Sequence, residues 1–220
     1  MISFIESSVP KAGVPLYHLK VVLDETKPVL WRRLQVPGNA SLGWLHAVLQ
    51  VAMGWMNCHL HQFRVGEQIY SDPAFELNEF KDDPPVFNEN KITVAAVAPR
   101  PRDLMDYEYD FGDSWHHYIT VEKILRPDPA ASRVALCLDG ARACPPEDCG
   151  GTTGYRHLLK ILRNPKHKEH KFMKEWLDRP FDPEAFDLES VNFYLRKLKW
   201  PRTTESQLRK VLLARDDSRE

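Results

Sequence analysis

The chain has 220 residues, of which 43% are hydrophobic and 28% are charged, and its 30 Lys+Arg residues nearly balance 31 Asp+Glu residues. No run of about 18 apolar residues is present, which excludes a membrane-spanning helix, and aliphatic and aromatic residues recur almost to the C-terminus, which excludes a disordered chain. The N-terminal segment lacks a basic region and a long apolar stretch. We therefore expect a cytoplasmic protein with reduced cysteines and no membrane partner.

The near-zero net charge hides an uneven distribution. Residues 1–150 carry 14 basic and 20 acidic side chains, whereas residues 151–220 carry 16 basic and 11 acidic ones. The basic C-terminal third could bind a polyanion, or it could attract the acidic remainder of the chain.

Period-2 alternation predicts two strands near the N-terminus. Leu19, Val21 and Leu23 share one side of residues 17–23, and residues 28–37 repeat the pattern. The DETK segment between them predicts a hairpin. A helix is expected to begin after Ser41, a suitable N-cap, and to end at Gly54, before a third strand at residues 61–70.

Residues 71–103 are rich in Pro, Asp and Asn, and predict a long connection with one helical turn after Thr93. Residues 106–125 predict a second hairpin with its turn at residues 111–114. Strands grouped around one helix indicate an α+β fold, with a mixed sheet of about five strands crossed by one helix.

The character of the chain changes beyond residue 127, and a helical C-terminal section is expected. Helices are predicted at residues 154–165, 170–177 and 203–214, and Asp182 and Asp187 are suitable N-caps for two more. The expected organisation is an N-terminal tail (1–15), one domain (16–200) with a sheet part (16–126), a Cys/Pro/Gly loop (137–154) and a helical part (155–200), and a C-terminal helix or tail (201–220).

Five segments in this order resemble one family: KPVLWRRLQVP, GWMNCHLHQF, YEYDFGDSWHHYITVE, ACPPEDCGGTTGY and FDPEAFDLESVN. Over about residues 16–198 the chain is similar to the plasmid pRiA ORF-three-like family, whose members are encoded on plasmids, transposons and chromosomes. The resemblance implies a single α+β domain with a β-grasp-like sheet and an association with mobile elements. It implies no established activity.

Acidic and aromatic residues alternate in residues 106–111, which in a strand places three carboxylates on one face, those of Asp106, Glu108 and Asp110. A solvent-exposed carboxylate face opposes aggregation and is the favoured interpretation. If the face lined a cleft, it could hold Mg²⁺ or Mn²⁺.

The second strand of this hairpin places Asp113, Trp115 and His117 on one parity. Trp115 and His117 are therefore candidate binding residues, with Asp113 orienting the imidazole or capping the turn. As catalytic candidates, Asp110 and Asp113 would supply carboxylates and His117 an acid or base. A packed Trp beside a turn-capping Asp is the alternative.

Cys137, Cys144 and Cys149 lie within thirteen residues, and closely spaced thiolates are candidate zinc ligands. His59, His61 or His157 would have to supply the fourth ligand. The alternatives are buried reduced cysteines, or Cys149 as a nucleophile with His157 as its base. In the same loop, Glu147 and Asp148 are candidate binding residues that could also cap backbone N–H groups.

The segment from residue 156 to 171 has six Lys/Arg residues, three histidines and one acid. Such a segment could neutralise nucleic-acid phosphates, although a solvated helix face is the favoured interpretation. The candidate phosphate-binding residues are Arg156, Lys160, Arg163, Lys166, Lys168 and Lys171.

The leading functional hypothesis is a non-enzymatic binding or accessory protein, associated with mobile elements and with nucleic acid or another protein. The first alternative is a metal-dependent hydrolase or nuclease that uses Asp110, Asp113 and His117. The second is a zinc-stabilised protein-interaction module. A shared site requires the turn at residues 111–114 and the loop at residues 137–154 to lie side by side.

Overall fold

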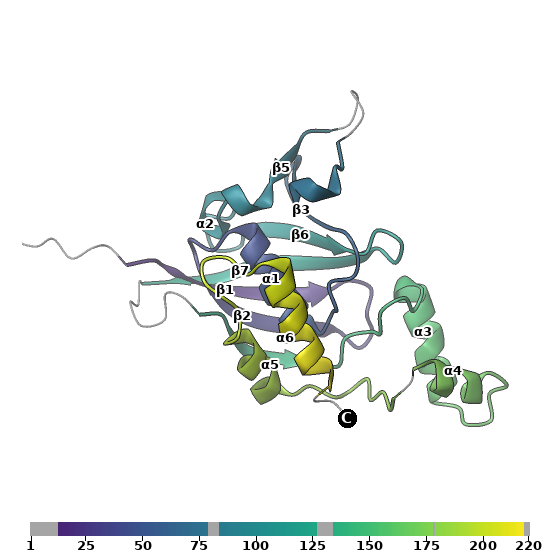
Figure 1. The fold of residues 1–220 in the computed structure, drawn as a ribbon. Helices are drawn as coiled ribbons and strands as arrows, with labels where there is room; N and C mark the ends of the chain where they lie inside the picture. Colours follow the sequence, from purple (N-terminus) through teal and green to yellow (C-terminus); the bar gives the residue numbers. More distant parts are fainter. Residues whose placement is uncertain (1–12, 79–83, 127–133, 178, 218–220) are drawn as a thin grey trace, which may run out of the picture.

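The computed structural model describes residues 13–78, 84–126, 134–177 and 179–217 (Figure 1). Its centre is one eight-stranded mixed sheet with the strand order β5-β4-β3-β6-β7-β1-β2-β8. Neighbouring strands are antiparallel except β4 and β5, which are parallel. The strands are β1 (Leu16–Leu23), β2 (Leu30–Pro37), β3 (His61–Val65), β4 (Gln68–Ser71), β5 (Val86–Asn88), β6 (Leu104–Tyr109), β7 (Trp115–Leu125) and β8 (Leu136–Ala141).

Six α-helices accompany the sheet in the described ranges. They are α1 (Leu42–Met53), α2 (Val94–Val97), α3 (Gly151–Leu162), α4 (His170–Trp176), α5 (Leu188–Leu195) and α6 (Glu205–Asp217). Helices α1, α5 and α6 lie together on one face of the sheet, whereas α3 and α4 project beyond one end of it (Figure 1). None of the described helices is long and apolar enough to cross a bilayer.

Local signals explain the first elements. The alternating side chains of β1 and β2 are buried beneath α1, and Thr26 closes their hairpin by donating to the Leu23 carbonyl and accepting from Leu30 N. Ser41 Oγ accepts a hydrogen bond from Trp44 N, and Gly54 ends α1 at φ 110°. Both expectations for this helix are confirmed.

The expected five-stranded, β-grasp-like sheet with one crossing helix is wrong, because the sheet has eight strands and the described residues form six α-helices. The predicted strand at residues 61–70 is a hairpin, β3–β4, in which Gly66 turns the chain at φ 58°. Strand β5 lies within the connection of residues 71–103, and β8 overlaps the first part of the predicted loop of residues 137–154. These strands are too short to show a clear alternation of apolar and polar residues, and they are stabilised by pairing with neighbouring strands.

The C-terminal section differs in detail from the expectation. The first predicted helix begins earlier, at Gly151, and Asp182 starts a turn rather than a helix, with Glu184 N donating to its side chain. Asp187 does cap α5, since its Oδ1 accepts from Ser190 N. Of the N-terminal tail expected at residues 1–15, residues 1–12 lie outside the described ranges.

Candidate metal centre and adjoining pocket

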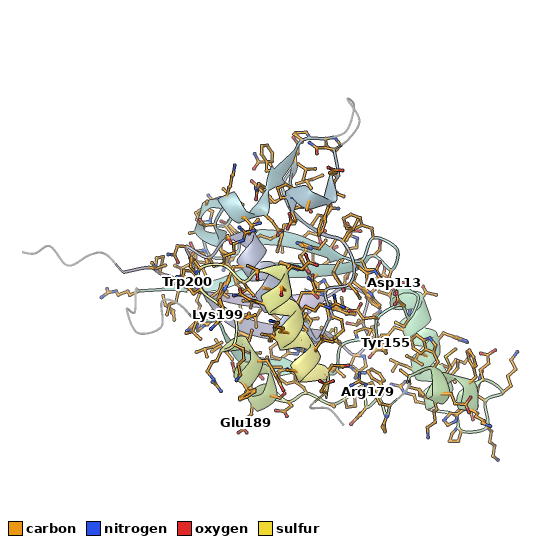
Figure 2. All side chains as sticks on the ribbon, in the orientation of Figure 1. Asp113, Tyr155, Arg179, Glu189, Lys199 and Trp200 are labelled. Carbon is orange, nitrogen blue, oxygen red and sulfur yellow. The ribbon has the colours of Figure 1, made fainter. Side chains whose placement is uncertain are left out.

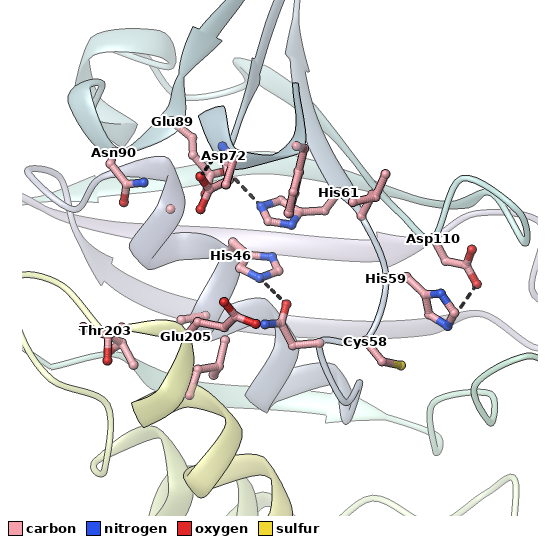
Figure 3. Close-up of a pocket in the computed structure, with 18 of the residues that line it drawn as sticks. His46, Cys58, His59, His61, Asp72, Glu89, Asn90, Asp110, Thr203 and Glu205 are labelled. Carbon is pink, nitrogen blue, oxygen red and sulfur yellow. Dashed lines mark hydrogen bonds and ion pairs between the residues drawn. The ribbon is translucent and has the colours of Figure 1, made fainter. Parts of the chain in front are cut away.

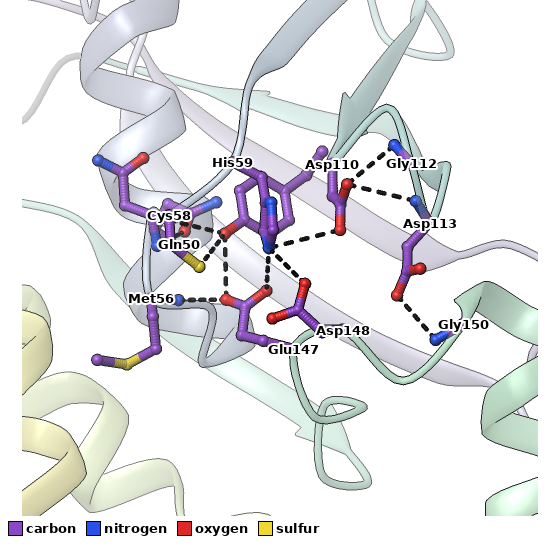
Figure 4. Close-up of polar contacts among 12 residues, drawn as sticks. Gln50, Met56, Cys58, His59, Asp110, Gly112, Asp113, Glu147, Asp148 and Gly150 are labelled. Carbon is purple, nitrogen blue, oxygen red and sulfur yellow. Dashed lines mark hydrogen bonds and ion pairs between the residues drawn. The ribbon is translucent and has the colours of Figure 1, made fainter.

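Three segments that are distant in the chain meet at one end of the sheet: the residues before β3, the β6–β7 turn, and the loop between β8 and α3 (Figure 4). Asp113 Oδ2 accepts a hydrogen bond from Gly150 N at 3.1 Å, and Asp110 N donates to the Leu60 carbonyl at 2.9 Å. The turn and the loop therefore do lie side by side, as a shared site requires.

Three carboxylates converge on the imidazole of His59 (Figure 4). His59 Nε2 lies 3.2 Å from Asp148 Oδ1, 3.6 Å from Asp110 Oδ2 and 3.8 Å from Glu147 Oε2. The sulfur of Cys58 lies within 4.8 Å of the His59 and Glu147 ligand atoms. We call His59, Asp110, Glu147 and Asp148 the His59 cluster.

The backbone holds two of these carboxylates by one oxygen each. Asp110 has φ 59°, and its Oδ1 accepts from Gly112 N and Asp113 N, which leaves Oδ2 facing His59. Glu147 Oε1 accepts from Met56 N at 2.6 Å and from the Tyr109 hydroxyl at 3.1 Å, and its Oε2 faces His59. These hydrogen bonds thus fix the positions of Asp110 Oδ2 and Glu147 Oε2, the oxygens that face His59, before any ligand binds.

The spacing in the His59 cluster suits a shared cation. Ligand atoms roughly 2.1 Å from a tetrahedral metal ion lie about 3.4 Å apart, and the three distances from His59 Nε2 are 3.2–3.8 Å. His59, Asp110 and Asp148 form one set whose ligand atoms all lie within 4.8 Å of one another, and His59, Glu147 and Cys58 form a second set that shares the imidazole. Within the described residues, the buried atoms His59 Nε2 and Glu147 Oε2 have no hydrogen-bond partner. Burial, more than the neighbouring Asp148 carboxylate, raises the pKa of Glu147. A bound cation would offset this cost of holding carboxylates together.

The His59 cluster borders a pocket of about 670 Å³ that extends between α1, the β4–β5 region and the start of α6 (Figure 3). The described lining has four carboxyl groups and one guanidinium. These are Asp72, Glu89, Asp110, Glu205 and Arg202.

Two stacked histidines line the pocket. The rings of His46 and His61 lie 3.5 Å apart, and His61 Nε2 lies 2.9 Å from Glu89 Oε2. Burial lowers the pKa of both histidines to about 3, and burial raises the pKa of Glu89 to about 7. At neutral pH these imidazoles are uncharged and contribute hydrogen-bonding groups rather than positive charge.

The structure places Trp115 and His117 in the core, where both are fully buried. Trp55 Nε1 donates to His117 Nε2, while His117 Nδ1 lies 3.1 Å from the Tyr107 carbonyl oxygen. Both side chains lie on one side of β7, as predicted. That side faces the core, which does not suit the binding and catalytic roles expected for these two residues. Asp113 holds the loop rather than orienting His117.

The three cysteines of the predicted zinc site do not come together. Among the described residues, the groups spaced for a metal ion are those around His59, and they contain neither Cys137, Cys144 nor Cys149. Burial raises the pKa of Cys137 to about 11 and that of Cys149 to about 12, so both are neutral thiols rather than nucleophiles.

Of the histidines considered as the fourth zinc ligand, only His59 belongs to the cluster. His61 lies beside Glu89, and His157 is exposed on α3 near Glu169.

The three carboxylates predicted to share one face of β6 do not point to the same site. Asp106 lies 3.2 Å from His116 Nδ1, and Glu108 accepts from Gln62 Nε2 at 2.7 Å, both on the sheet surface. Asp110 follows the end of the strand, and its positive φ directs it to the His59 cluster instead. The meeting of His59 with Glu147 and Asp148 leaves no local signal in the sequence, although all three residues lie in the segments that carry the family resemblance.

Fold and site together define an α+β protein with an eight-stranded mixed sheet and an imidazole–carboxylate cluster beside an acidic pocket. The chain belongs to the Plasmid pRiA4b ORF-3-like protein family, whose model matches residues 15–190, so the family resemblance is confirmed.

Two relatives extend this comparison. "Uncharacterized protein y4hQ" of Sinorhizobium fredii is 35% identical over 189 residues, which cover 84% of this chain and 94% of that protein. A crystal structure of the protein of unknown function MM3350 from Methanosarcina mazei Go1 is similar with a TM-score of 0.70 and 32% identity, over 81% of this chain and 98% of that one. Neither relative's name assigns an activity.

Proposed function

We propose that this protein binds one divalent metal ion at the His59 cluster, with His59, Asp110 and Asp148 as ligands and Glu147 beside them, and uses it to hydrolyse a small molecule held in the adjoining pocket. The observation that carries the proposal is the convergence of three carboxylate oxygens on His59 Nε2 at 3.2–3.8 Å. It replaces the expected use of Asp113 and His117 and keeps only Asp110 from that set.

The donor atoms favour particular ions. One imidazole nitrogen with carboxylate oxygens suits Mn²⁺ or Zn²⁺, whereas a thiolate site would select zinc more strictly. Desolvation and the neighbouring Glu147 carboxylate raise the pKa of Cys58, so its neutral thiol is a weaker ligand. A bound ion with a free position toward the pocket would lower the pKa of a water molecule and supply a hydroxide nucleophile.

The charge of the pocket favours a class of substrate. Its carboxyl groups outnumber its single guanidinium in the described lining, so a phosphate group would be repelled wherever the metal did not contact it. We expect a neutral or cationic substrate, which argues against the nuclease alternative at this site.

A cytoplasmic, non-enzymatic accessory protein associated with mobile elements is the alternative proposal. The family's plasmid-derived name supports an association with such elements, and free thiols at all four cysteines suit a reducing compartment. This alternative needs no hydrolysis, and a metal ion would then only stabilise the loop.

Metal binding tests the proposal first. Calorimetric titration of metal-free protein with Mn²⁺ and Zn²⁺ should show one equivalent bound, and His59→Gln and Asp148→Asn should each weaken binding at least about 10-fold. His157→Gln is the matched control, since His157 is also a histidine within 3.4 Å of a carboxylate, and it should bind as the wild type does. If no metal binds and His59→Gln only destabilises the fold, His59 is a structural partner of these carboxylates rather than a metal ligand.

Hydrolysis is measured separately, with metal-loaded protein and two probes. The neutral ester p-nitrophenyl acetate should be cleaved faster than the anionic bis(p-nitrophenyl) phosphate, and the rate should fall with the metal affinity of each variant. Stoichiometric metal binding without metal-dependent cleavage of either probe would favour the accessory protein.

A further inference from the structure

Helices α3 and α4 form a projection with a strong positive charge, which we call the basic arm (residues 151–177). It extends from the body at the loop that carries Glu147 and Asp148 (Figures 1 and 2). The arm has seven Lys/Arg residues and two acidic residues, whereas residues 1–150 carry an excess of acid. The charge asymmetry of the chain is therefore concentrated in one projecting element.

Most of this positive charge is unpaired. Glu169 lies 3.6 Å from Lys168, and Glu175 lies 3.7 Å from Lys171, so the two acids of the arm are already near lysines. Within the described residues, no carboxylate lies within ion-pair distance of the remaining five cations. These are Arg156, Lys160, Arg163, Lys166 and Lys174.

Two large aromatic side chains are exposed on the same arm. Phe172 is 60% exposed and Trp176 is 41% exposed, and their spacing of four residues places them on one side of α4. The arm's apolar contacts are made by other residues: Tyr155, Leu158 and Leu159 are buried, and Met173 packs against the core. The two rings are therefore not needed to hold the arm together.

We propose that the basic arm binds single-stranded nucleic acid. Unpaired Lys and Arg side chains neutralise backbone phosphates, and exposed aromatic rings stack on bases of any sequence. Stacking requires bases that are not already stacked in a duplex, which is why the rings favour a single strand. This site differs from the acidic pocket in position and charge, and it does not depend on the proposed metal ion.

The test uses the full-length protein and fluorescein-labelled oligo-dT of 20 nucleotides, with affinity measured by anisotropy at several salt concentrations. Affinity should fall as salt rises, with a log–log slope of about −3 if four or five phosphates are contacted. Lys160→Glu with Arg163→Glu should weaken binding at least about 10-fold at 0.1 M salt and reduce the slope. Lys91→Glu with Lys199→Glu, which changes exposed lysines outside the arm, should have little effect.

A second double variant measures how much the two aromatic rings contribute to nucleic-acid affinity. Phe172→Ala with Trp176→Ala should weaken binding at least about 5-fold without changing the salt slope, because stacking releases no counterions. Circular dichroism should show that these surface variants remain folded.

The proposal would be overturned if oligo-dT did not bind at 50 mM salt, or if the control variant lost as much affinity for it as the arm variant. It would also be overturned if duplex DNA or polyglutamate bound as tightly as oligo-dT. A concentration-dependent dimer abolished by the aromatic double variant would instead identify the arm as a contact between copies.

Discussion

Glu147 serves the fold with one oxygen and the candidate metal centre with the other. Oε1 accepts from Met56 N and the Tyr109 hydroxyl, which joins the loop to the residues before β3 and to β6, while Oε2 faces His59. Asp148 differs, because its side chain is 71% exposed. The two neighbouring carboxylates can therefore separate a structural effect from a metal-binding effect.

Glu147→Ala should lower the free energy of unfolding by about 1–3 kcal/mol, because Met56 N and the Tyr109 hydroxyl lose the acceptor of their part-buried hydrogen bonds. Asp148→Ala should change it by less than about 0.5 kcal/mol. Both should weaken metal binding. Urea denaturation without metal measures the first effect and calorimetry the second; an equally stable Glu147→Ala variant would show that the loop is held by other contacts.

Buried histidines should make stability depend on pH. Burial lowers the pKa of His117 to about 4 and that of His46 and His61 to about 3, from an ordinary value of 6.5. Below pH 6.5 the unfolded chain binds protons that the folded protein does not, so this stability is present above 6.5 and lost as the pH falls toward 4 and 3. Glu89 acts oppositely: with its pKa raised from 4.5 to about 7, its contribution is full below 4.5 and lost as the pH rises to 7.

Burial also raises the pKa of Glu147, so two glutamates oppose the three histidines. The histidines still outnumber them, and we predict that the protein loses stability on acidification from pH 6.5 to 4.5. His117→Gln should reduce the slope of unfolding free energy against pH in this window by about 1.4 kcal/mol per pH unit, the effect of one proton. Asn164→Ala, at an exposed residue that does not titrate, should leave the slope unchanged. Urea denaturation across this range measures both; identical slopes for His117→Gln and wild type would contradict the assigned role.

At the scale of elements, α5 satisfies backbone groups at the edge of the sheet. Strand β8 is an edge strand, and the Asn192 side chain on α5 both accepts from Cys137 N and donates to the Cys137 carbonyl, at 2.8 Å each. The helix thereby covers a strand edge that could otherwise pair with another chain.

Asn192→Ala should lower the free energy of unfolding by about 2 kcal/mol, since it leaves two backbone groups without their partner. Asn164→Ala is a control at an exposed residue and should cost less than about 1 kcal/mol. Hydrogen exchange should accelerate at Cys137 N–H only in Asn192→Ala. Unchanged exchange there would mean that α5 protects the edge by packing alone.

Glycines allow the loop to lie close to the first turn of α3 and to the β6–β7 turn. A Cβ on Gly154 would lie 1.9 Å from the Cys149 carbonyl oxygen, and one on Gly151, at φ 63°, would lie 2.6 Å from the Asp113 carbonyl oxygen. The backbone around Glu147 and Asp148 is therefore positioned by contacts that tolerate no side chain.

Gly154→Ala should displace this loop and weaken metal binding at least about 10-fold without altering a ligand. Gly66→Ala is the control: at φ 58° with open space around its Cβ, it should cost about 1 kcal/mol and leave metal affinity unchanged. Calorimetry and thermal unfolding measure the two effects, and equal metal affinity in both variants would show that the loop adapts.

At the scale of the whole molecule, Arg32 joins separate parts of the body. Its guanidinium is buried and donates to the carbonyl groups of Ala52 at the end of α1, Ala141 on β8, and Arg142 in the following loop, and it stacks on Phe186. A single planar group thus connects the helix, the sheet edge and the segment before α5.

Arg32→Lys should lower the free energy of unfolding by about 3 kcal/mol or more, because an ammonium group cannot reproduce this forked set of hydrogen bonds. Arg33→Lys, at a part-exposed ion pair with Glu122, should cost less than about 1 kcal/mol. Urea denaturation measures the free energy of unfolding of both variants. Similar losses in the two would mean that the hydrogen bonds of Arg32 contribute little to stability.

The predicted boundary at residue 200 stays a prediction. Helix α6 packs on α1 and α5, so the segment after residue 200 covers the same sheet face as these two helices.

Features that depend on neighbours along the chain can be predicted without the fold. Ser41 and Gly54 mark the ends of α1, Asp187 marks the start of α5, and alternation marks the β1–β2 and β6–β7 hairpins, because capping and side-chain periodicity act over a few residues. The family resemblance rests on motifs that are equally local.

The burial of one face of each strand and the meeting of distant residues depend instead on how the whole chain packs. Alternation placed Trp115 and His117 on one side of β7, but only the position of α1 makes that side the core. The short strands β4, β5 and β8 are stabilised by their partners, so their own residues carry a weak signal. The His59 cluster joins three segments separated by dozens of residues, and because no local interaction connects them, only the folded sheet brings them together.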